Sequence, residues 1–314
     1  MLQRKVHADL KVHWRQFFAV WLVLVMGTAF YGAFYPAGKS LLQTIYTAYD
    51  DFNYMDVEVR LPFGMPLSKL DEVREVSGVQ AASGRLVLEA GIQLQADSSF
   101  LTHLRLIGLP EVVNEEEVNR SEIVEGRAIE ADDEVLLLKR FADYHHIRPG
   151  DTVAIWLAGE VRRFRVAGLV FNPEYLVGGR DRESPFPTPS AFGVAWLSHH
   201  ALAEWANVPG IINQIVVRSP NPAAQIVAHD RTQLVEQLTG WLEDQPQWTI
   251  WEREQTASGG VIQANITGNF QVMAAFSAMF LLAAVVVTAI LLGRMVQSQR
   301  QQIGTLRALG VTRF

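Results

Sequence analysis

Two pairs of adjacent histidines are the first candidates for metal ligands in this chain of 314 residues. They are His145-His146 and His199-His200. Neighbouring residues on a strand or a helix point in different directions, so an adjacent pair rarely places both imidazoles on one ion. The chain also contains no cysteine. We therefore expect no metal site, no cofactor and a fold that holds together without disulfides.

Catalytic motifs of the common hydrolases and ATPases are missing from the sequence. It contains no phosphate-binding loop that ends in Gly-Lys-Ser/Thr, no Gly-x-Ser-x-Gly and no His-Glu-x-x-His. We expect no catalytic residues and no ATP binding by this chain itself. Two charged runs are typical of exposed surfaces: the acidic run Glu115-Glu116-Glu117 predicts a solvated face, and Arg162, Arg163 and Arg165 predict the outer side of a strand.

The last 21 residues carry the most informative spacing. Ile303, Leu306 and Gly310 recur at the i, i+3, i+7 positions of one helix face, and Arg300 and Arg307 fall on the adjacent flank. A short amphipathic helix of this kind either lies on an anionic lipid surface or docks in a groove of a partner protein. The glycines in this segment favour the protein partner, because glycine allows close backbone approach.

Two uncharged apolar runs, at residues 17–35 and 270–293, must position this segment. They contain 19 and 24 residues, and a helix needs about 20 to cross the hydrocarbon core of a membrane. Bulky aromatic residues end the first run, where a cleaved signal peptide would need small ones. We therefore expect two transmembrane helices rather than a signal peptide or buried helices of a soluble core.

The charges beside the two runs predict their orientation. Residues 1–16 carry four Lys or Arg and one Asp, and four Arg with no acid follow residue 270. The remainder carries 19 basic and 32 acidic residues. Because Lys and Arg concentrate on the cytoplasmic side, we expect cytoplasmic ends at 1–16 and 294–314 and an extracytoplasmic domain at 36–269.

Periodicity in the outer segment predicts two strand–helix–strand units, one at each end. The first comprises a half-buried strand at 56–61, a helix at 66–78, and a strand at 79–95 with a turn at Ser83-Gly84. The second comprises a strand at 211–218, a helix at 222–241 and a strand at 248–251. We assign both units to one α/β lobe, at residues 50–100 and 205–255.

The stretch between these units is richer in strands. Its expected elements are a strand at 134–138, a short helix at 140–146, a turn at 148–151, a hairpin at 152–168 and a long loop at 172–190. We therefore expect a β-rich lobe inserted at residues 101–204. The fold class is then an α-helical membrane protein with an α+β extracytoplasmic domain.

The C-terminal segment resembles the signature of FtsX-like, or MacB-type, ABC transporter permeases. Their pattern follows the membrane helix that returns from the outer domain and runs roughly Glu-Ile-Gly-x-Leu-Arg-Ala-Leu-Gly-Ala-Ser. This chain matches it at Ile303, Gly304, Leu306, Arg307, Ala308, Leu309 and Gly310, and Arg300 supplies the basic residue ahead of it. It departs at Gln302, where the family has Glu, so a salt bridge from this position is not expected.

The resemblance extends along the outer domain. The family's patterns occur here as Val124-Glu-Gly126-Arg127, Glu134-Val-Leu-Leu-Leu, Gly150-Asp151-Thr152-Val153 and Phe164-Arg-Val166-Ala-Gly168-Leu-Val170. Members divide this domain, the MacB-like periplasmic core, into an α/β lobe and an inserted β-rich lobe. They continue with at least two more membrane helices, so the resemblance implies that the sequence ending at Phe314 is part of a longer protein.

The resemblance implies a multi-pass permease subunit of the bacterial inner membrane. In this family a cytoplasmic ABC ATPase, separate or fused, hydrolyses ATP, and the permease passes the movement to its outer domain for export or mechanical signalling. The implied partners are that ATPase, a second permease copy or homologous half, a periplasmic adaptor and the lipid bilayer, but no nucleic acid. The implied coupling residues are Arg300, Ile303, Gly304, Leu306, Arg307, Leu309 and Gly310.

Two other classes of protein fit the same topology. A two-helix receptor or sensor would carry an outer ligand-binding domain and a cytoplasmic output, for which only 21 residues follow Gly293. A membrane-anchored enzyme would need the catalytic motifs that this sequence lacks. An adjacent ATPase gene would distinguish the permease from both.

Overall fold

The computed structural model of the chain describes residues 2–94, 101–109, 117–176, 188–220 and 228–308. The chain divides into two compact units, the first formed by Met1–Leu42 with Asn265–Phe314 and the second by Gln43–Ala264. Two long helices, α1 (Leu2–Asp51) and α6 (Ala257–Ala308), supply the first unit, and the last residues of α1 and the first residues of α6 belong to the second. Both helices extend past the apolar runs expected to form the membrane spans.

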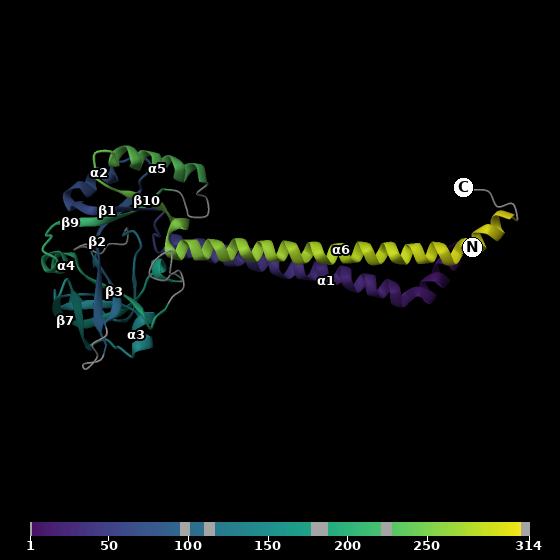
Figure 1. The fold of residues 1–314 in the computed structure, drawn as a ribbon, viewed down its shortest axis with the longest axis horizontal. Helices are drawn as coiled ribbons and strands as arrows, with labels where there is room; N and C mark the ends of the chain where they lie inside the picture. Colours follow the sequence, from purple (N-terminus) through teal and green to yellow (C-terminus); the bar gives the residue numbers. More distant parts are fainter. Residues whose placement is uncertain (1, 95–100, 110–116, 177–187, 221–227, 309–314) are drawn as a thin grey trace. The chain divides into compact units, whose positions relative to one another are not determined.

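Glycines of α1 bring the two helices of the first unit close together. A Cβ added at Gly27 would lie 3.0 Å from the Cβ of Phe280, and one at Gly38 would lie 3.2 Å from the ring of Phe270. The rings of Tyr35 and Phe270 lie 6.3 Å apart. Figure 1 shows α1 and α6 running alongside each other. Small residues that allow such close approach are typical of packed membrane helices.

The second unit contains ten strands among its described residues, joined in one mixed sheet of order β10-β1-β9-β2-β3-β8-β5-β7-β4, with β6 pairing with β2 and β7. The strands are β1 (Val57–Pro66), β2 (Ala81–Gln93), β3 (Thr102–Leu109), β4 (Glu122–Gly126), β5 (Glu134–Leu138), β6 (Thr152–Leu157), β7 (Glu160–Phe171), β8 (Phe192–Ser198), β9 (Ile211–Arg218) and β10 (Thr249–Glu252). Parallel and antiparallel pairs both occur. This unit is an α+β fold, as the sequence predicts.

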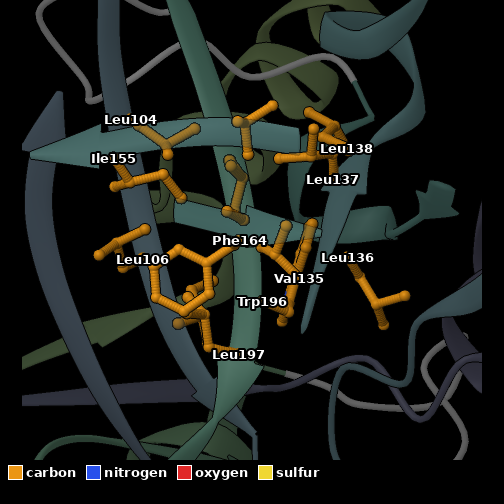
Figure 2. Packing of buried hydrophobic residues seen from close by; sticks show 14 of the residues in the cluster. Leu104, Leu106, Val135, Leu136, Leu137, Leu138, Ile155, Phe164, Trp196 and Leu197 are labelled. Carbon is orange, nitrogen blue, oxygen red and sulfur yellow. The ribbon is translucent and has the colours of Figure 1, made fainter. Parts of the chain in front are cut away.

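Six of these strands close into a ring. β2 pairs with β3, β3 with β8, β8 with β5, β5 with β7, β7 with β6, and β6 again with β2. Closure removes free strand edges within the ring. Figure 2 shows Leu106, Phe164 and Trp196, from three different strands, packed together in its interior. With α3 (Lys139–His145) and α4 (His199–Trp205) we call this ring the barrel core.

Three other strands, β10, β1 and β9, form a smaller open sheet with the first half of β2, whereas β4 pairs with β7 of the ring. Two helices, α2 (Leu70–Arg74) and α5 (Ala228–Leu242), lie on the same face of the open sheet (Figure 1). Their residues Leu70, Leu234 and Leu238 are buried against the strands, and each such side chain contributes about 1.5 to 3 kcal/mol. We call this part the open-sheet core. The two cores are separate hydrophobic clusters.

Strand β2 belongs to both cores. Its residues from Ala81 to Arg85 pair with β9, and those from Leu86 to Ile92 pair with β3. Ala82 accordingly lies in the cluster of the open-sheet core and Leu86 in that of the barrel core. The lobe boundaries expected at residues 101 and 204 remain predictions.

Several elements follow the sequence pattern closely. β5 and β9 have the expected bounds, and the hairpin of β6 and β7 turns at Ala158-Gly159. From residue 228 onward the helix expected at 222–241 is present as α5 (Ala228–Leu242), and residues 222–227 lie outside the described residues. The long loop expected at 172–190 begins with a 3-10 turn, η2 (Pro173–Tyr175).

The turn expected at Ser83-Gly84 is wrong, because β2 runs through both residues. A Cβ at Gly84 would lie 2.5 Å from the Cδ1 of Ile212, so this glycine permits close packing rather than a turn. The strand expected at 56–61 is also more buried than its alternating pattern predicts. Asp56 and Glu58 are only 1% and 2% exposed, because both carboxylates have partners inside the unit.

The helix expected at 66–78 is shorter than its pattern. A 3-10 turn, η1 (Leu67–Lys69), precedes α2, which ends at Arg74. The helix ends before Gly78, the residue expected to stop it. Gly78 has a φ of +89°, a backbone conformation that favours glycine.

Candidate functional site

The coupling residues expected from the sequence lie at the C-terminal end of α6. Five of them are in its last turns: Arg300, Ile303, Gly304, Leu306 and Arg307. Arg300 and Gly304 are exposed, and a Cβ at Gly304 would meet no described atom within 4 Å. Leu309 and Gly310 lie outside the described residues. The helical spacing is therefore present up to Ala308, and docking of a partner there stays a prediction.

The histidine pairs have ordinary structural contacts. His145 Nε2 lies 3.0 Å from the carbonyl oxygen of Pro189. His199 is buried, whereas the exposed His200 lies 3.5 Å from Asp132. Neighbouring histidines thus point in different directions. In the described ranges, no group of three or more His, Cys, Asp or Glu could hold a metal ion.

The two charged runs behave differently. Arg162, Arg163 and Arg165 are exposed, as expected for the outer side of β7, and Arg165 pairs with Glu134. The prediction of a solvated acidic face is wrong for Glu117, which is only 8% exposed. Burial raises the pKa of Glu117 to about 7, although Arg85 lowers it. Residues 115 and 116 lie outside the described residues.

The patterns of the outer domain that carry the family resemblance have a structural role. Gly126 has a φ of +80°, and a Cβ there would overlap the carbonyl oxygen of Ala167. A Cβ at Gly168 would lie 2.6 Å from the carbonyl oxygen of Arg127. Arg127 in turn donates to the buried Glu134 at 2.7 Å. These residues hold β4, β5 and β7 together.

Two arginines hold the end of α1 in the second unit. Arg218 of β9 donates to the backbone oxygen of Asp50 at 3.2 Å and to its carboxylate at 3.0 Å. Arg120 donates to the backbone oxygen of Asp51 at 3.0 Å. Both arginines therefore cap the C-terminus of α1, where the helix dipole favours cations.

An ion pair joins the segment that follows α1 to the segment that precedes α6. Arg253 Nη2 donates to Asp56 Oδ1 at 3.0 Å, and Ser219 donates from its N and Oγ to Asp56 Oδ2 at 2.8 and 2.9 Å. Both ion-pair side chains are at most 3% exposed. Burial raises the pKa of Asp56 above its usual value even though Arg253 and Ser219 lower it. The pair therefore does not fully offset the cost of removing the carboxylate from water.

Helix α6 begins directly after this pair. Thr256 Oγ1 donates to the carbonyl oxygen of Arg253 at 2.7 Å and accepts from Gly259 N at 3.2 Å. This is an N-cap arrangement, which satisfies a free donor of the first turn. A Cβ at Gly259 would overlap the carbonyl oxygen of Arg253, so the first turn of α6 packs directly against the backbone of this residue.

A second buried cluster surrounds Glu174 in η2. Arg85 of β2 donates to its two carboxylate oxygens at 2.8 and 3.2 Å, and Asn119 Nδ2 donates at 2.8 Å. Burial alone would raise the pKa of Glu174, but Arg85 and Asn119 outweigh it and lower this pKa below its usual value. Ser258, in the first turn of α6, donates from Oγ to the backbone oxygen of Glu174 at 2.6 Å.

Asn119 extends this cluster to the residues that follow α1. Its Oδ1 accepts from Met55 N at 2.8 Å, and its own N donates to the carbonyl oxygen of Asn53 at 3.0 Å. The clusters around Asp56 and Glu174 together connect the ends of both long helices to both cores. Hydrophobic periodicity misses them, because the paired residues are 197 and 89 positions apart in sequence.

One described segment has the character of a membrane span. Ala257–Arg294 of α6 is long and apolar enough to cross a bilayer, with a mean hydropathy of 2.6 over its most apolar window. It contains the second run expected from the sequence. The first run lies within α1, and its membrane crossing remains a prediction.

Comparison with known proteins supports the resemblance. Residues 274–313 match the family model described as FtsX-like permease C-terminal, and this confirms the resemblance to that family. No curated protein matches the chain. Among solved structures, the chain is similar to the periplasmic region of MacB from Actinobacillus actinomycetemcomitans, with a TM-score of 0.41 and 14% identity over 67% of this chain and 92% of that one. It is also similar to the extracellular domain of the noncanonic ABC-type transporter YknZ from Gram-positive bacteria, with a TM-score of 0.38 and 12% identity over 62% and 99% of the two chains.

Proposed function

We propose that this FtsX-like permease is the membrane subunit of an ABC-type export or mechanotransmission complex. A cytoplasmic ATPase docks on the segment at 294–314, and ATP hydrolysis there moves the extracytoplasmic second unit. The family match at 274–313 carries the proposal, because it joins an apolar helix to the Arg-containing segment that follows it. ATP binding and hydrolysis belong to the partner, and this chain transmits the movement.

The surface of α6 supports its insertion in a bilayer. Leu281, Leu282 and Val285 are 54%, 67% and 66% exposed. Leaving such side chains in water costs about 1.5 to 3 kcal/mol each, whereas lipid tails would cover them. In the proposal α1 also spans the bacterial inner membrane, through residues 17–35, with both basic flanks in the cytoplasm.

The hydrogen-bonded charged residues at the helix ends support the mechanical part of the proposal. A force on the cytoplasmic end of α6 passes along one hydrogen-bonded helix to Thr256, which is bonded to Arg253. The end of α1 is held in the same way by Arg218 and Arg120. Only residues 52–56 separate α1 from β1, and only residues 253–256 separate β10 from α6. A second permease copy or homologous half beside the helices, and a periplasmic adaptor on the second unit, complete the proposed complex.

A substitution at Leu306 tests the docking. Burying this side chain in a partner contributes about 1.5 to 3 kcal/mol, so we expect Leu306→Asp to weaken ATPase binding about tenfold to a hundredfold or more. Gln301→Asp places the same charge on the opposite side of the helix and should bind normally. The measurement is ATPase co-purification and stimulated ATP turnover with the full-length protein. Normal values for Leu306→Asp would overturn the docking assignment and leave lipid contact as the role of this segment.

A further inference from the structure

Strand β2 passes from one core to the other between two consecutive residues. Arg85 is the last residue that pairs with β9, and Leu86 is the first that pairs with β3. We propose that this crossover is a hinge between the open-sheet core and the barrel core, that the ion pair of Arg85 with Glu174 locks it, and that Ser258 connects the lock to α6.

Each core has the features of a body that moves as a whole. The barrel core is a closed ring with its own interior, which includes Leu106, Phe164 and Trp196 (Figure 2). The open-sheet core has its own cluster beneath α2 and α5. Packed interiors resist continuous deformation, so relative motion concentrates where the two bodies are joined.

On the β9 side of β2, pairing changes at the crossover from backbone to a side chain, while the backbone ladder with β3 begins on the other side. Beyond Arg85, the side chain of Asn213 replaces the backbone of β9. Its Oδ1 accepts from Val87 N at 2.7 Å and its Nδ2 donates to Val87 O at 2.8 Å. A side-chain amide can follow a rotation of the strand that a backbone ladder would oppose. The crossover therefore has the bonding expected of a hinge.

The ion pair spans this hinge. Arg85 lies on β2 at the crossover, and Glu174 lies in η2 after the barrel strand β7. Their side chains are 5% and 10% exposed. A buried ion pair adds little net stability over apolar side chains, but separating it leaves the guanidinium of Arg85 without its carboxylate and Glu174 with neutral donors such as Asn119, both out of water. The pair therefore favours one relative position of the cores over all others.

The lock is bonded directly to the first turn of α6. Ser258, which is 1% exposed, donates to the backbone oxygen of Glu174. A displacement of this turn pulls on η2 and hence on the carboxylate that Arg85 holds. The lock itself is independent of the proposed function, and only its use by an ATPase-driven α6 rests on that proposal.

Spin labels on the two cores test the lock. The sequence has no cysteine, so Gln237→Cys on α5 and Tyr144→Cys on α3 give one defined pair of labels. In the full-length protein we expect one narrow distance distribution between them. Glu174→Gln removes the charge while keeping the shape of the side chain, and we expect it to broaden the distribution at least twofold. The same distribution in Glu174→Gln as in the parent would overturn the lock.

Glu134→Gln is the matched control. Like Glu174, Glu134 is a buried carboxylate in an ion pair. Its two partners, Arg127 and Arg165, both belong to the barrel side. We expect no broadening for it. If Glu174→Gln does not fold, the double variant Arg85→Met/Glu174→Met replaces both charges with apolar side chains and should fold with the broadened distribution. Failure of both variants to fold, while Glu134→Gln folds, would mean that the pair holds the fold together and would overturn the lock.

Ser258→Ala tests the connection to α6 without touching the ion pair. We expect faster hydrogen exchange at the amide of Glu174, whose N donates to Asn172 Oδ1, and a distance distribution as narrow as that of the parent. Unchanged exchange at this amide would overturn the connection and leave the lock standing.

Discussion

At the scale of single residues, the second unit is organised by charges that are buried and shared. Asp56 has three hydrogen bonds to its carboxylate, from Arg253 and Ser219. Glu174 likewise binds Arg85 and Asn119. Because a buried charge without a partner is costly, each of these residues depends on the others.

Removing Arg253 leaves Asp56 buried and unpaired. We expect Arg253→Met to lower the free energy of unfolding by about 3 to 5 kcal/mol near neutral pH. The loss should shrink toward pH 5, because the isolated carboxyl can then be protonated. Urea unfolding followed by tryptophan fluorescence measures both values. Arg74→Met is the control: its pair with Asp71 is exposed, and we expect a change below about 1 kcal/mol. A similarly small change for Arg253→Met would contradict the role of the pair.

Glu117 predicts a pH dependence of opposite sign to that of a paired carboxylate. Its pKa is about 7 in the folded chain, above the unfolded value of 4.5. The folded state therefore keeps a proton that the unfolded state loses, so this stabilisation is complete below pH 4.5 and is lost as the pH rises through about 7. Relative to the parent, we expect Glu117→Gln to gain up to about 3 kcal/mol between about pH 5 and pH 8. Equal pH profiles for Glu117→Gln and the parent would exclude this titration.

At the scale of elements, the local sequence pattern is sufficient to predict the bounds of some strands. β9 is rich in Ile and Val and is bounded by Gly210 and Pro220, so its limits are readable from the sequence. β2 is different, because Gly84 looks like a turn residue until Ile212 is found beside it. The buried clusters escape sequence reasoning for the same reason. Nothing near Glu174 in the chain indicates that Arg85 will meet it.

The contact between α1 and α6 predicts unequal effects at two glycines. A Cβ at Gly27 would lie 3.0 Å from Phe280, whereas one at Gly32 meets nothing within 4 Å. We expect Gly27→Leu to weaken the helix pair by about 1 to 3 kcal/mol through overpacking and Gly32→Leu to leave it intact. Disulfide formation between Leu24→Cys and Ala284→Cys, which line one groove, should fall only for Gly27→Leu. Equal yields for the two glycine variants would refute the close packing.

At the scale of the whole molecule, the sign of the net charge differs between segments of the chain. The stretch between the two apolar runs is strongly acidic, and both ends of the chain are basic. The positive-inside rule then predicts one orientation for both helices. The coupling residues at the C-terminal end remain predictions from sequence, because the contacts that would define their role lie on another molecule.

Cysteine labelling in intact cells checks this orientation. We expect cysteines at Gln3 and Gln301 to resist a membrane-impermeant thiol reagent and one at Tyr144, which is 56% exposed, to react. Permeabilised cells provide the control, because all three positions should then react. Labelling of the Gln3 position before permeabilisation would contradict the two-helix topology.

The ion pair of Asp56 and Arg253 has a consequence for how this architecture can be modified. These residues are 197 positions apart, yet they are hydrogen-bonded to each other, so the intervening chain leaves the helices and returns to them at one point. A segment with adjacent ends can be removed, exchanged or inserted without rebuilding its surroundings. The segment 57–252 is thus a cassette: a short loop could join Asp56 to Arg253 in its place, or the corresponding segment of another protein could replace it, while the sequence at 294–314 stays unchanged.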